Sequence, residues 1–341
     1  MIKIFATNFI VSRTPFRITL GGGGTDLPFF YEKEGGFLIS ASIKKYMYVL
    51  VSKRVHRDLL LSYSKSEMCS SLDDIQHPVI KECLKISNLA DHLAILSYAD
   101  IPAKSGLGSS GSFTVGLLNA INAYQNKYVQ NEELAELACH IQMNVLNEPS
   151  GKQDEYIATF GGLTCFDISK TGKVTSTPLQ IANSTKQELE NNLLFFDTGI
   201  LRSANDVLAD QKIVSETEPE KIEHLRKIKD IGYRTKKVLE SGNLDEFGTL
   251  LDEHWTQKKN TSKKISNPDI DTKYNLAKSL GALGGKLIGA GGGGFLMFYA
   301  NTKLSKTNIR KKFSSLGMNE MKFPFESKGT KIILDLSEGV Q

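Results

Sequence analysis

The most informative segment of the chain is IPAKSGLGSSGSFTVG, residues 101–116. Its centre, GLGSSG at residues 106–111, matches the G-x-G-x-x-G fingerprint of dinucleotide-binding proteins. That fingerprint also requires a second parallel strand after the helix, with an acidic residue at its end about 20 positions on. Residues 112–146 instead have helical spacing almost throughout, and Glu132 and Glu133 open a helix. An NAD-dependent oxidoreductase is therefore a distant alternative.

The same loop has the properties of a polyphosphate site. Glycines let the backbone approach a ligand closely, and the helix that begins near Ser109 and Ser110 offers free N–H groups. Hydroxyls at these positions could bond phosphate or a Mg²⁺ ion. A Walker loop is absent, because Leu280 replaces the first glycine of the pattern that would place its lysine at Lys286. From the loop alone, a phosphate site and a tight strand-to-helix turn are equally good explanations.

The bulk composition predicts a soluble, cytoplasmic globular protein of two domains. The chain has 341 residues, of which 40% are hydrophobic and 23% charged, and no apolar run approaches the roughly 18 residues that span a bilayer. The net charge of +4 is not concentrated in a Lys/Arg block, so neither a nucleic-acid partner nor a membrane is expected. The four cysteines form no C-x-x-C pair and the histidines no H-x-x-x-H pair, which disfavours a zinc site.

The order of periodic segments predicts a change of architecture in the middle of the chain. The first hundred residues are rich in strand patterns, with one helix near residues 75–86, and the glycine loop is followed by helices. After the strand LLFFDTG, helices are expected at residues 218–240, 244–260 and 269–280, followed by a glycine-rich hairpin, KLIGAGGGGFLMFYA, and a helix at 308–316. We place the boundary near residues 183–192, which gives domains 1–185 and 186–341.

Three further segments change the balance between these explanations. PFRITLGGGGTDLPFF (residues 15–30) precedes the loop, and GKQDEY (151–156) and GAGGGG (289–294) follow it. In this order the motifs resemble those of the GHMP small-molecule kinases, and the resemblance covers almost the whole chain. It implies an α+β fold of two domains, the first like domain 2 of ribosomal protein S5 and the second ferredoxin-like. It also implies ATP as the phosphoryl donor, Mg²⁺, and an active site in the cleft between the domains.

Finer features are similar to one branch of these kinases. DTGILRSA (residues 197–204) and HWTQKKN (254–260) resemble the sugar-1-kinases that phosphorylate D-glycero-D-manno-heptose 7-phosphate. The resemblance implies a sugar phosphate and ATP as small-molecule partners and is compatible with a homodimer. A kinase for an unphosphorylated sugar such as fucose or galactose, and a nonenzymatic sugar- or nucleotide-binding regulator, remain alternatives.

The resemblance also assigns roles to individual residues. Asp154 matches the acid that orients the acceptor hydroxyl and takes its proton, and Arg17 matches the basic residue beside it. On the residues alone, Asp154 could instead cap a helix, Arg17 could form a surface ion pair and Asp26 an Asx turn. The ATP phosphates are expected at Lys104, Ser105, Gly106, Leu107, Gly108, Ser109, Ser110 and Gly111. The acceptor is expected at Gly24, Thr25, Asp26, Lys152, Arg202 and Gly292.

One position departs from the family pattern. Ser110 matches a serine that ligates Mg²⁺ in related kinases, but the second expected ligand, a glutamate nine positions before Gly151, is Gln142 here. An amide oxygen is neutral and therefore a weaker ligand for a hard cation. Either ATP, Ser110 and water hold the metal, or another acid such as Glu148 contributes. The further candidates for a cationic pocket are Lys258 and Lys259, which could equally form a solvated helix face.

Overall fold

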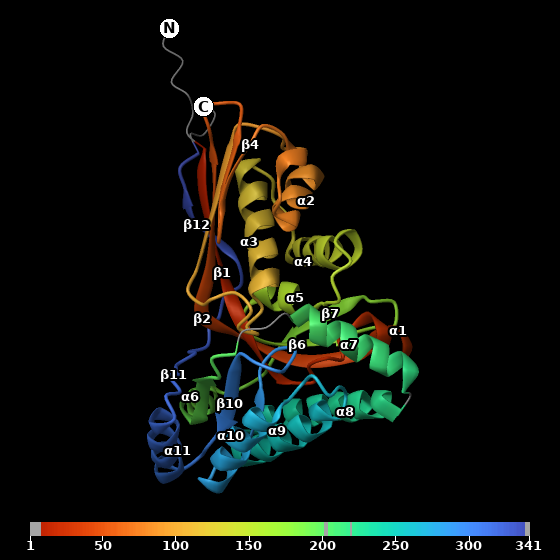
Figure 1. The fold of residues 1–341 in the computed structure, drawn as a ribbon, viewed down its shortest axis with the longest axis vertical. Helices are drawn as coiled ribbons and strands as arrows, with labels where there is room; N and C mark the ends of the chain where they lie inside the picture. Colours follow the sequence, from red (N-terminus) through yellow and green to blue (C-terminus); the bar gives the residue numbers. More distant parts are fainter. Residues whose placement is uncertain (1–7, 201–203, 219, 338–341) are drawn as a thin grey trace.

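The computed structural model describes residues 8–200, 204–218 and 220–337. Its upper part is built on a mixed sheet with helices on one face, and its lower part on a smaller sheet with its own helices (Figure 1). This arrangement confirms the predicted α+β class with two structural units. Among the described residues, no helix combines the length and the apolar character needed to cross a membrane.

The upper sheet is organised around one long strand, β2 (Gly36–Lys53). Its second half pairs with β5 (Leu93–Ala99), its first half pairs with β6 (Leu163–Ile168), and β1 (Phe9–Gly21) runs antiparallel along its whole length. The strand order is β12-β1-β2-β5-β3-β4, with β6 and β7 attached to the other half of β2. The remaining strands are β3 (Leu59–Ser62), β4 (Ser66–Cys69), β7 (Val174–Pro178) and β12 (Lys331–Asp335).

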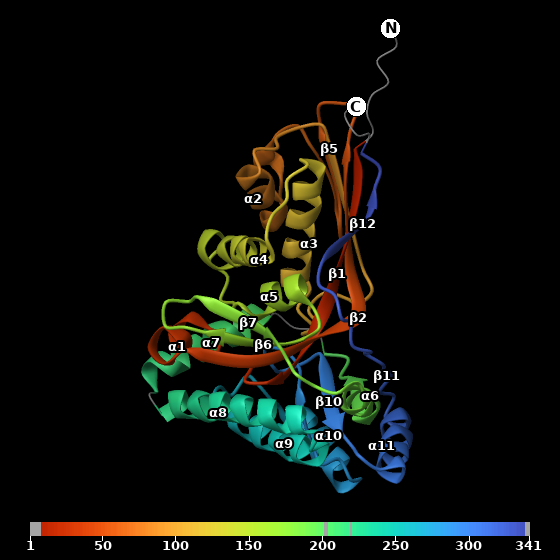
Figure 2. The same ribbon diagram turned by 180° about the vertical axis from the view of Figure 1, so that it is seen from behind.

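Helices cover one face of this sheet, as the views from both sides show (Figures 1 and 2). Helix α3 (Ser109–Tyr124) lies along β1 and β2 and is buried on most of its surface, including Val115 and Leu117. The chain then passes through α4 (Asn131–Cys139), a π-helical turn (His140–Val145) and α5 (Gln153–Phe160). No strand lies between α3 and α5 in this described part, so the second strand of a dinucleotide-binding unit is absent. Two more helices are α1 (Pro28–Glu34) and α2 (Pro78–Ile86).

The lower sheet has four antiparallel strands in the order β11-β8-β10-β9. These strands are β8 (Leu193–Asp197), β9 (Gly284–Leu287), β10 (Phe295–Tyr299) and β11 (Glu320–Met321). Trp255 and Phe298 anchor a second apolar core between this sheet and its helices. The helices of this part are α6 (Asn183–Asn192), α7 (Ala204–Thr217), α8 (Glu220–Ser241), α9 (Leu244–Lys259), α10 (Pro268–Ser279) and α11 (Lys303–Ser315).

The two parts are joined more closely than the predicted division at residue 185 allows. That position lies inside α6, and the final strand β12 returns to the upper sheet, where it pairs with β1. Helix α8 also packs directly under the upper sheet, with Tyr233 stacked on Phe37 at a ring-centroid distance of 4.0 Å. The unit that begins near residue 186 therefore does not extend to the end of the chain.

Candidate active site

The glycine loop leads from β5 into α3, and its glycines are required by close contacts. Gly106 and Gly108 have φ angles of 82° and 81°, in the left-handed region that favours glycine. A Cβ on Gly108 would lie 3.1 Å from Cγ of Arg17 and 3.3 Å from Oδ2 of Asp154. A Cβ on Gly111 would lie 2.6 Å from Cβ of Asp154. The loop is therefore packed against the side chains that the motifs singled out.

A cavity of about 690 Å³ runs along this loop between the two parts of the molecule. Ser109 and Ser110, which begin α3, line this cavity at the end of the helix where the helix dipole favours an anion. Beyond the loop, the upper part contributes an apolar wall that the motifs did not indicate. That wall includes Met47, Tyr63, His77, Val79, Ile101 and Phe113.

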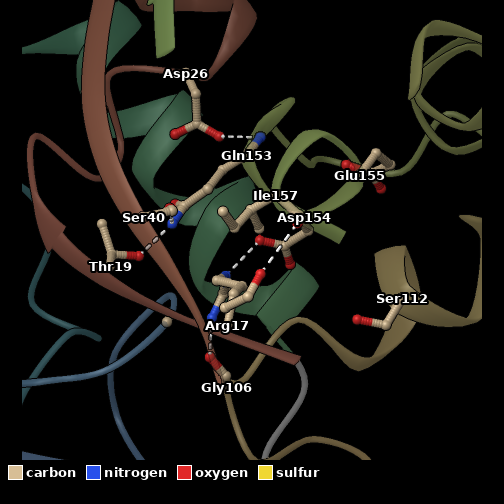
Figure 3. Close-up of polar contacts among 12 residues, drawn as sticks. Arg17, Thr19, Asp26, Ser40, Gly106, Ser112, Gln153, Asp154, Glu155 and Ile157 are labelled. Atoms are coloured by element: carbon tan, nitrogen blue, oxygen red, sulfur yellow. Dashed lines mark hydrogen bonds and ion pairs between the residues drawn. The ribbon is translucent and has the colours of Figure 1, made fainter. Parts of the chain in front are cut away.

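Arg17 and Asp154 form the central contact of the site (Figure 3). Arg17 Nε donates to Asp154 Oδ1 at 2.7 Å, and Arg17 Nη1 donates to the carbonyl oxygen of Gly106 at 2.6 Å. Arg17 is only 6% exposed, whereas the side chain of Asp154 is 30% exposed. The guanidinium is thus fixed between the loop and the carboxylate, and the carboxylate keeps access to the cavity. Asp154 stands in the first turn of α5, where a negative charge is favoured.

Asp26 lies beside the start of α5 and also lines the cavity (Figure 3). Its Oδ2 accepts from the backbone N–H of Gln153 at 3.1 Å, and its Oδ1 accepts from the N–H of Gly24 at 3.2 Å. Burial raises the pKa of Asp26, the charge of Asp154 raises it further, and the backbone donors oppose this. The amide of Gln153 is fixed by the hydroxyls of Thr19 and Ser40 (Figure 3).

A third carboxyl group, Glu155, was not anticipated from the sequence. It is 2% exposed and lies apart from the Arg17–Asp154 pair (Figure 3), with the thiol of Cys139 4.0 Å from its Oε2. Burial, followed by the charge of Asp154, raises its pKa to about 8. With a pKa of about 8, most of the Glu155 carboxyl groups carry a proton at pH 7.

The two residues expected at a metal site lie side by side. Gln142 Nε2 donates to Ser110 Oγ at 2.8 Å and to Thr114 Oγ1 at 2.6 Å. Gln142 belongs to the π-helical turn, a local distortion that is frequent at functional sites. Glu148 also lines the cavity and accepts a hydrogen bond from Asn205 of α7. Among the described residues, no group of three His, Cys, Asp or Glu side chains could hold a metal ion.

Several other expected residues lie elsewhere. Lys152 donates to Glu136 at 2.7 Å and to the carbonyl of Gly172, outside the cavity, because a half-buried carboxylate of α4 already pairs with it. The hydroxyl of Thr25 is bonded to the carbonyls of Gly22 and Phe37, so it stabilises the turn instead of facing a ligand.

Of the remaining predicted site residues, some line the cavity and others do not. Gly292 donates to the carbonyl of Ile265, and it is Gly289 and Ala290 of the same run that line the cavity. Lys259 pairs with Asp271 and does not line the cavity. Ser105 and Leu107 are buried within the loop and do not line the cavity either. Lys104 and Lys258 do line the cavity. Arg202 lies outside the described residues.

Comparison with known proteins agrees with this geometry. The protein-family model described as "GHMP kinases N terminal domain" matches residues 77–162 of this chain. The model described as "GHMP kinases C terminal" matches residues 235–317. The chain is 29% identical to a D-glycero-alpha-D-manno-heptose 7-phosphate kinase of Campylobacter jejuni, over 94% of this chain and 98% of that protein. It is 25% identical to an L-fucokinase/L-fucose-1-P guanylyltransferase of Bacteroides fragilis, but it spans only 36% of that protein's length.

Solved structures show the same relationship. A D-glycero-D-manno-heptose 1-phosphate kinase from Bacteroides thetaiotaomicron superimposes with a TM-score of 0.78 at 25% identity, over 95% of this chain and 99% of that one. A galactokinase from Lactococcus lactis complexed with galactose has a TM-score of 0.74 at 20% identity, over 95% of both chains. The second likeness, at this lower identity, concerns the fold alone.

Proposed function

We propose that this chain, which belongs to the GHMP kinase family of ATP-dependent phosphotransferases, phosphorylates the anomeric C1 hydroxyl of D-glycero-D-manno-heptose 7-phosphate. The product would be the 1,7-bisphosphate used to make nucleotide-activated heptose. The proposal is supported by near-complete coverage of both chains in the similarity to the Campylobacter heptose phosphate kinase. The observation that carries the chemistry is the Arg17–Asp154 pair beside the loop Gly106–Gly111 in a shared cavity.

In this proposal Asp154 is the base. Arg17 engages Oδ1, and Oδ2 faces the glycine loop, where the phosphoryl group would be transferred. The acceptor hydroxyl gives its proton to this carboxylate while its oxygen bonds to the γ-phosphorus, and the bond to the β-phosphate oxygen breaks to release ADP. Arg17, which already contacts Gly106, stabilises the negative charge on the moving group. Asp26 accepts hydrogen bonds from the sugar or, when protonated, donates one.

The nucleotide is expected to lie along the loop and the start of α3. The N–H groups near Ser109 and Ser110 and the side chain of Lys104 would hold its phosphates. The residues fit a Mg²⁺ ion that takes most of its ligands from phosphate and water, because Mg²⁺ commonly uses one or two protein ligands. Here these would be the hydroxyl of Ser110 and the amide oxygen of Gln142, both neutral, after the Gln142 amide has turned over, because its Nε2 faces Ser110 in this structure. When bound, the metal would neutralise charge on the phosphates.

The second candidate is a kinase for a free sugar, which the similarity to the fucokinase favours. ADP release should therefore be measured with heptose 7-phosphate, free heptose, fucose and galactose. Turnover confined to the phosphorylated heptose supports the proposal, and a preference for a free sugar replaces it. ATP binding without turnover on any of the four would favour a regulator. Phosphorus NMR of the product then identifies the modified oxygen.

The assignment of the base is tested by Asp154→Asn. Turnover should fall by about 100-fold or more, because the amide cannot take the proton, while ATP still binds. Asp73→Asn is the matched control, since the side chain of Asp73 is 90% exposed and does not line the cavity. An Asp154→Asn protein with wild-type kcat would remove Asp154 from the reaction.

A further inference from the structure

Lys286 is a buried lysine on a largely apolar face of the lower sheet. It stands on β9 directly opposite Met297 of β10, so the two side chains share a face of the sheet. Met297 packs in the core that the lower sheet shares with the upper part, whereas Leu287, the next residue of β9, packs in the second core. Lys286 therefore points toward the upper part of the molecule. It lines the cavity there and is only 2% exposed.

The ammonium of Lys286 lacks the partner that a buried charge normally has. Among the residues that the structure describes, it forms no hydrogen bond and no ion pair. Burial, followed by the positive charges of Lys258 and Arg17, lowers the pKa of Lys286 well below its ordinary value. His254 also lines the cavity nearby, but an imidazole supplies no negative charge. The group that Lys286 can satisfy itself with is therefore an anion in the cavity, which would favour its charged form.

The chain that follows Lys286 is held against the glycine loop. A Cβ on Gly289, three residues further on, would lie 2.6 Å from the carbonyl oxygen of Gly106. Arg17 Nη1 donates to this same oxygen at 2.6 Å, and Arg17 Nε donates to Asp154 (Figure 3). The end of β9, the glycine loop and the Arg17–Asp154 pair therefore meet at Gly106. Lys286 lies close enough to this point for the charge of Arg17 to act on it.

We propose that Lys286 binds the γ-phosphoryl group of ATP and stabilises it during transfer to the sugar. The inference rests on the proposed function, in which this group passes between the glycine loop and Asp154. Two of the nitrogens of Arg17 are already engaged by Asp154 and Gly106, whereas the ammonium of Lys286 has its donors available.

The chemistry of the step is unchanged by this assignment. The acceptor oxygen bonds to the γ-phosphorus, the bond to the β-phosphate oxygen breaks, and the proton of the acceptor goes to Asp154. Lys286 takes part only through its charge and its hydrogen bonds to the phosphoryl oxygens, where negative charge is concentrated during transfer. Its burial makes these bonds strong, because little water competes for them.

The test uses Lys286→Met, because methionine suits the apolar face that Lys286 shares with Met297. Its kcat with the best sugar substrate should fall by about 100-fold, the usual loss when one charge-stabilising donor is removed. The thermal unfolding midpoint should stay unchanged or rise, because a buried polar group without a partner is lost. Lys278→Met is the matched control and should keep the wild-type kcat, since Lys278 pairs with Asp252 at 3.1 Å and does not line the cavity.

Binding measurements by calorimetry identify the phosphate that Lys286 contacts. Mg·ADP lacks the γ-phosphoryl group, and Mg·AMP-PNP, an ATP analogue that resists transfer, carries it. Lys286→Met should bind Mg·AMP-PNP about tenfold or more weakly than the wild type, the loss expected for hydrogen bonds to a charged group. Its affinity for Mg·ADP should stay within about twofold of the wild type, because the contact is with the γ-phosphoryl group alone.

The other outcomes separate the inference from the proposed function. A wild-type kcat in Lys286→Met, an unchanged affinity for Mg·AMP-PNP, or an equal loss of affinity for both nucleotides overturns the inference while the proposed function stands. An equal loss of kcat in Lys278→Met overturns it too. If the wild type prefers a sugar other than heptose 7-phosphate, the heptose assignment falls, and the same measurements on that sugar decide the role of Lys286. If the wild type turns over no sugar, both fall together.

Discussion

Replacing Glu155 by glutamine should remove a pH dependence from the stability of this protein. Glu155 follows Asp154 in the chain and is buried, and its pKa rises from the ordinary value of 4.5 to about 8. Between pH 4.5 and pH 8, Glu155 therefore keeps its proton in the folded protein but has lost it in the unfolded chain. The stability that this proton provides is fully present below pH 4.5 and is lost as the pH rises through 8. Glutamine has nearly the same shape and remains neutral at every pH.

The shift sets the size of the effect. Each pH unit between the two pKa values changes the free energy of unfolding by up to about 1.4 kcal/mol. Between pH 5.5 and pH 8.5 the wild type should thus lose about 3 kcal/mol relative to Glu155→Gln. The other titrating groups are common to both proteins and cancel in this comparison. The variant should therefore become the more stable protein at alkaline pH.

Urea unfolding followed by circular dichroism at several pH values measures this difference directly. Glu133→Gln is the control, because Glu133 is an exposed residue of α4, and its difference from the wild type should stay flat across the range. The reasoning would be refuted if the free energies of unfolding of Glu155→Gln and the wild type also differed by the same amount at every pH. It would mean that Glu155 is ionised in the folded protein and that its burial is compensated by another group.

Two further predictions concern the loop and the metal. Gly108→Ala and Gly317→Ala should each lose about 1 kcal/mol of stability, because both glycines have left-handed φ angles. Only Gly108→Ala should also lose most of its kcat/KM, since its Cβ would press on Arg17 whereas that of Gly317 meets nothing within 4 Å; equal activity in the two variants would contradict this. Gln142→Glu should lower the Mg²⁺ concentration at half-maximal ADP release, because a carboxylate beside Ser110 is a stronger ligand than an amide. An unchanged Mg²⁺ titration would exclude residue 142 from the metal site.

Local motifs were enough to predict the parts of the fold and the site that depend on local geometry. The helices at 220–241, 244–259 and 268–279 lie within two residues of their expected bounds, because their apolar spacing is regular. The pairing of Arg17 with Asp154 was expected through the resemblance and is present. The length of β2 was not evident from the sequence, because Lys44 and Lys45 interrupt an apolar pattern that the backbone continues through as one strand.

Charge pairing across the fold could not be read from the sequence, and this explains the errors among the basic residues. Lys152 stands two positions from Asp154, yet its ammonium reaches Glu136 of α4, a partner fixed only by how α4 packs on α5. Lys286 looked like the lysine of a failed Walker motif, but β9 carries it into the cavity from more than a hundred residues away. Sequence distance from a motif is therefore a poor guide to which lysine can meet a ligand.

The carboxyl groups of Asp26, Asp154 and Glu155 lie close together in the structure but have different surroundings. Asp26 and Glu155 are buried, and for both the desolvation of the charged form outweighs their hydrogen bonds, so the pKa of each is raised. Asp154 lies between them, remains partly exposed and is the one that pairs with Arg17. Neighbouring acids in different environments usually have different roles. Asp154 is the carboxyl group that faces the glycine loop and touches Arg17, so it is the one placed to take a proton there.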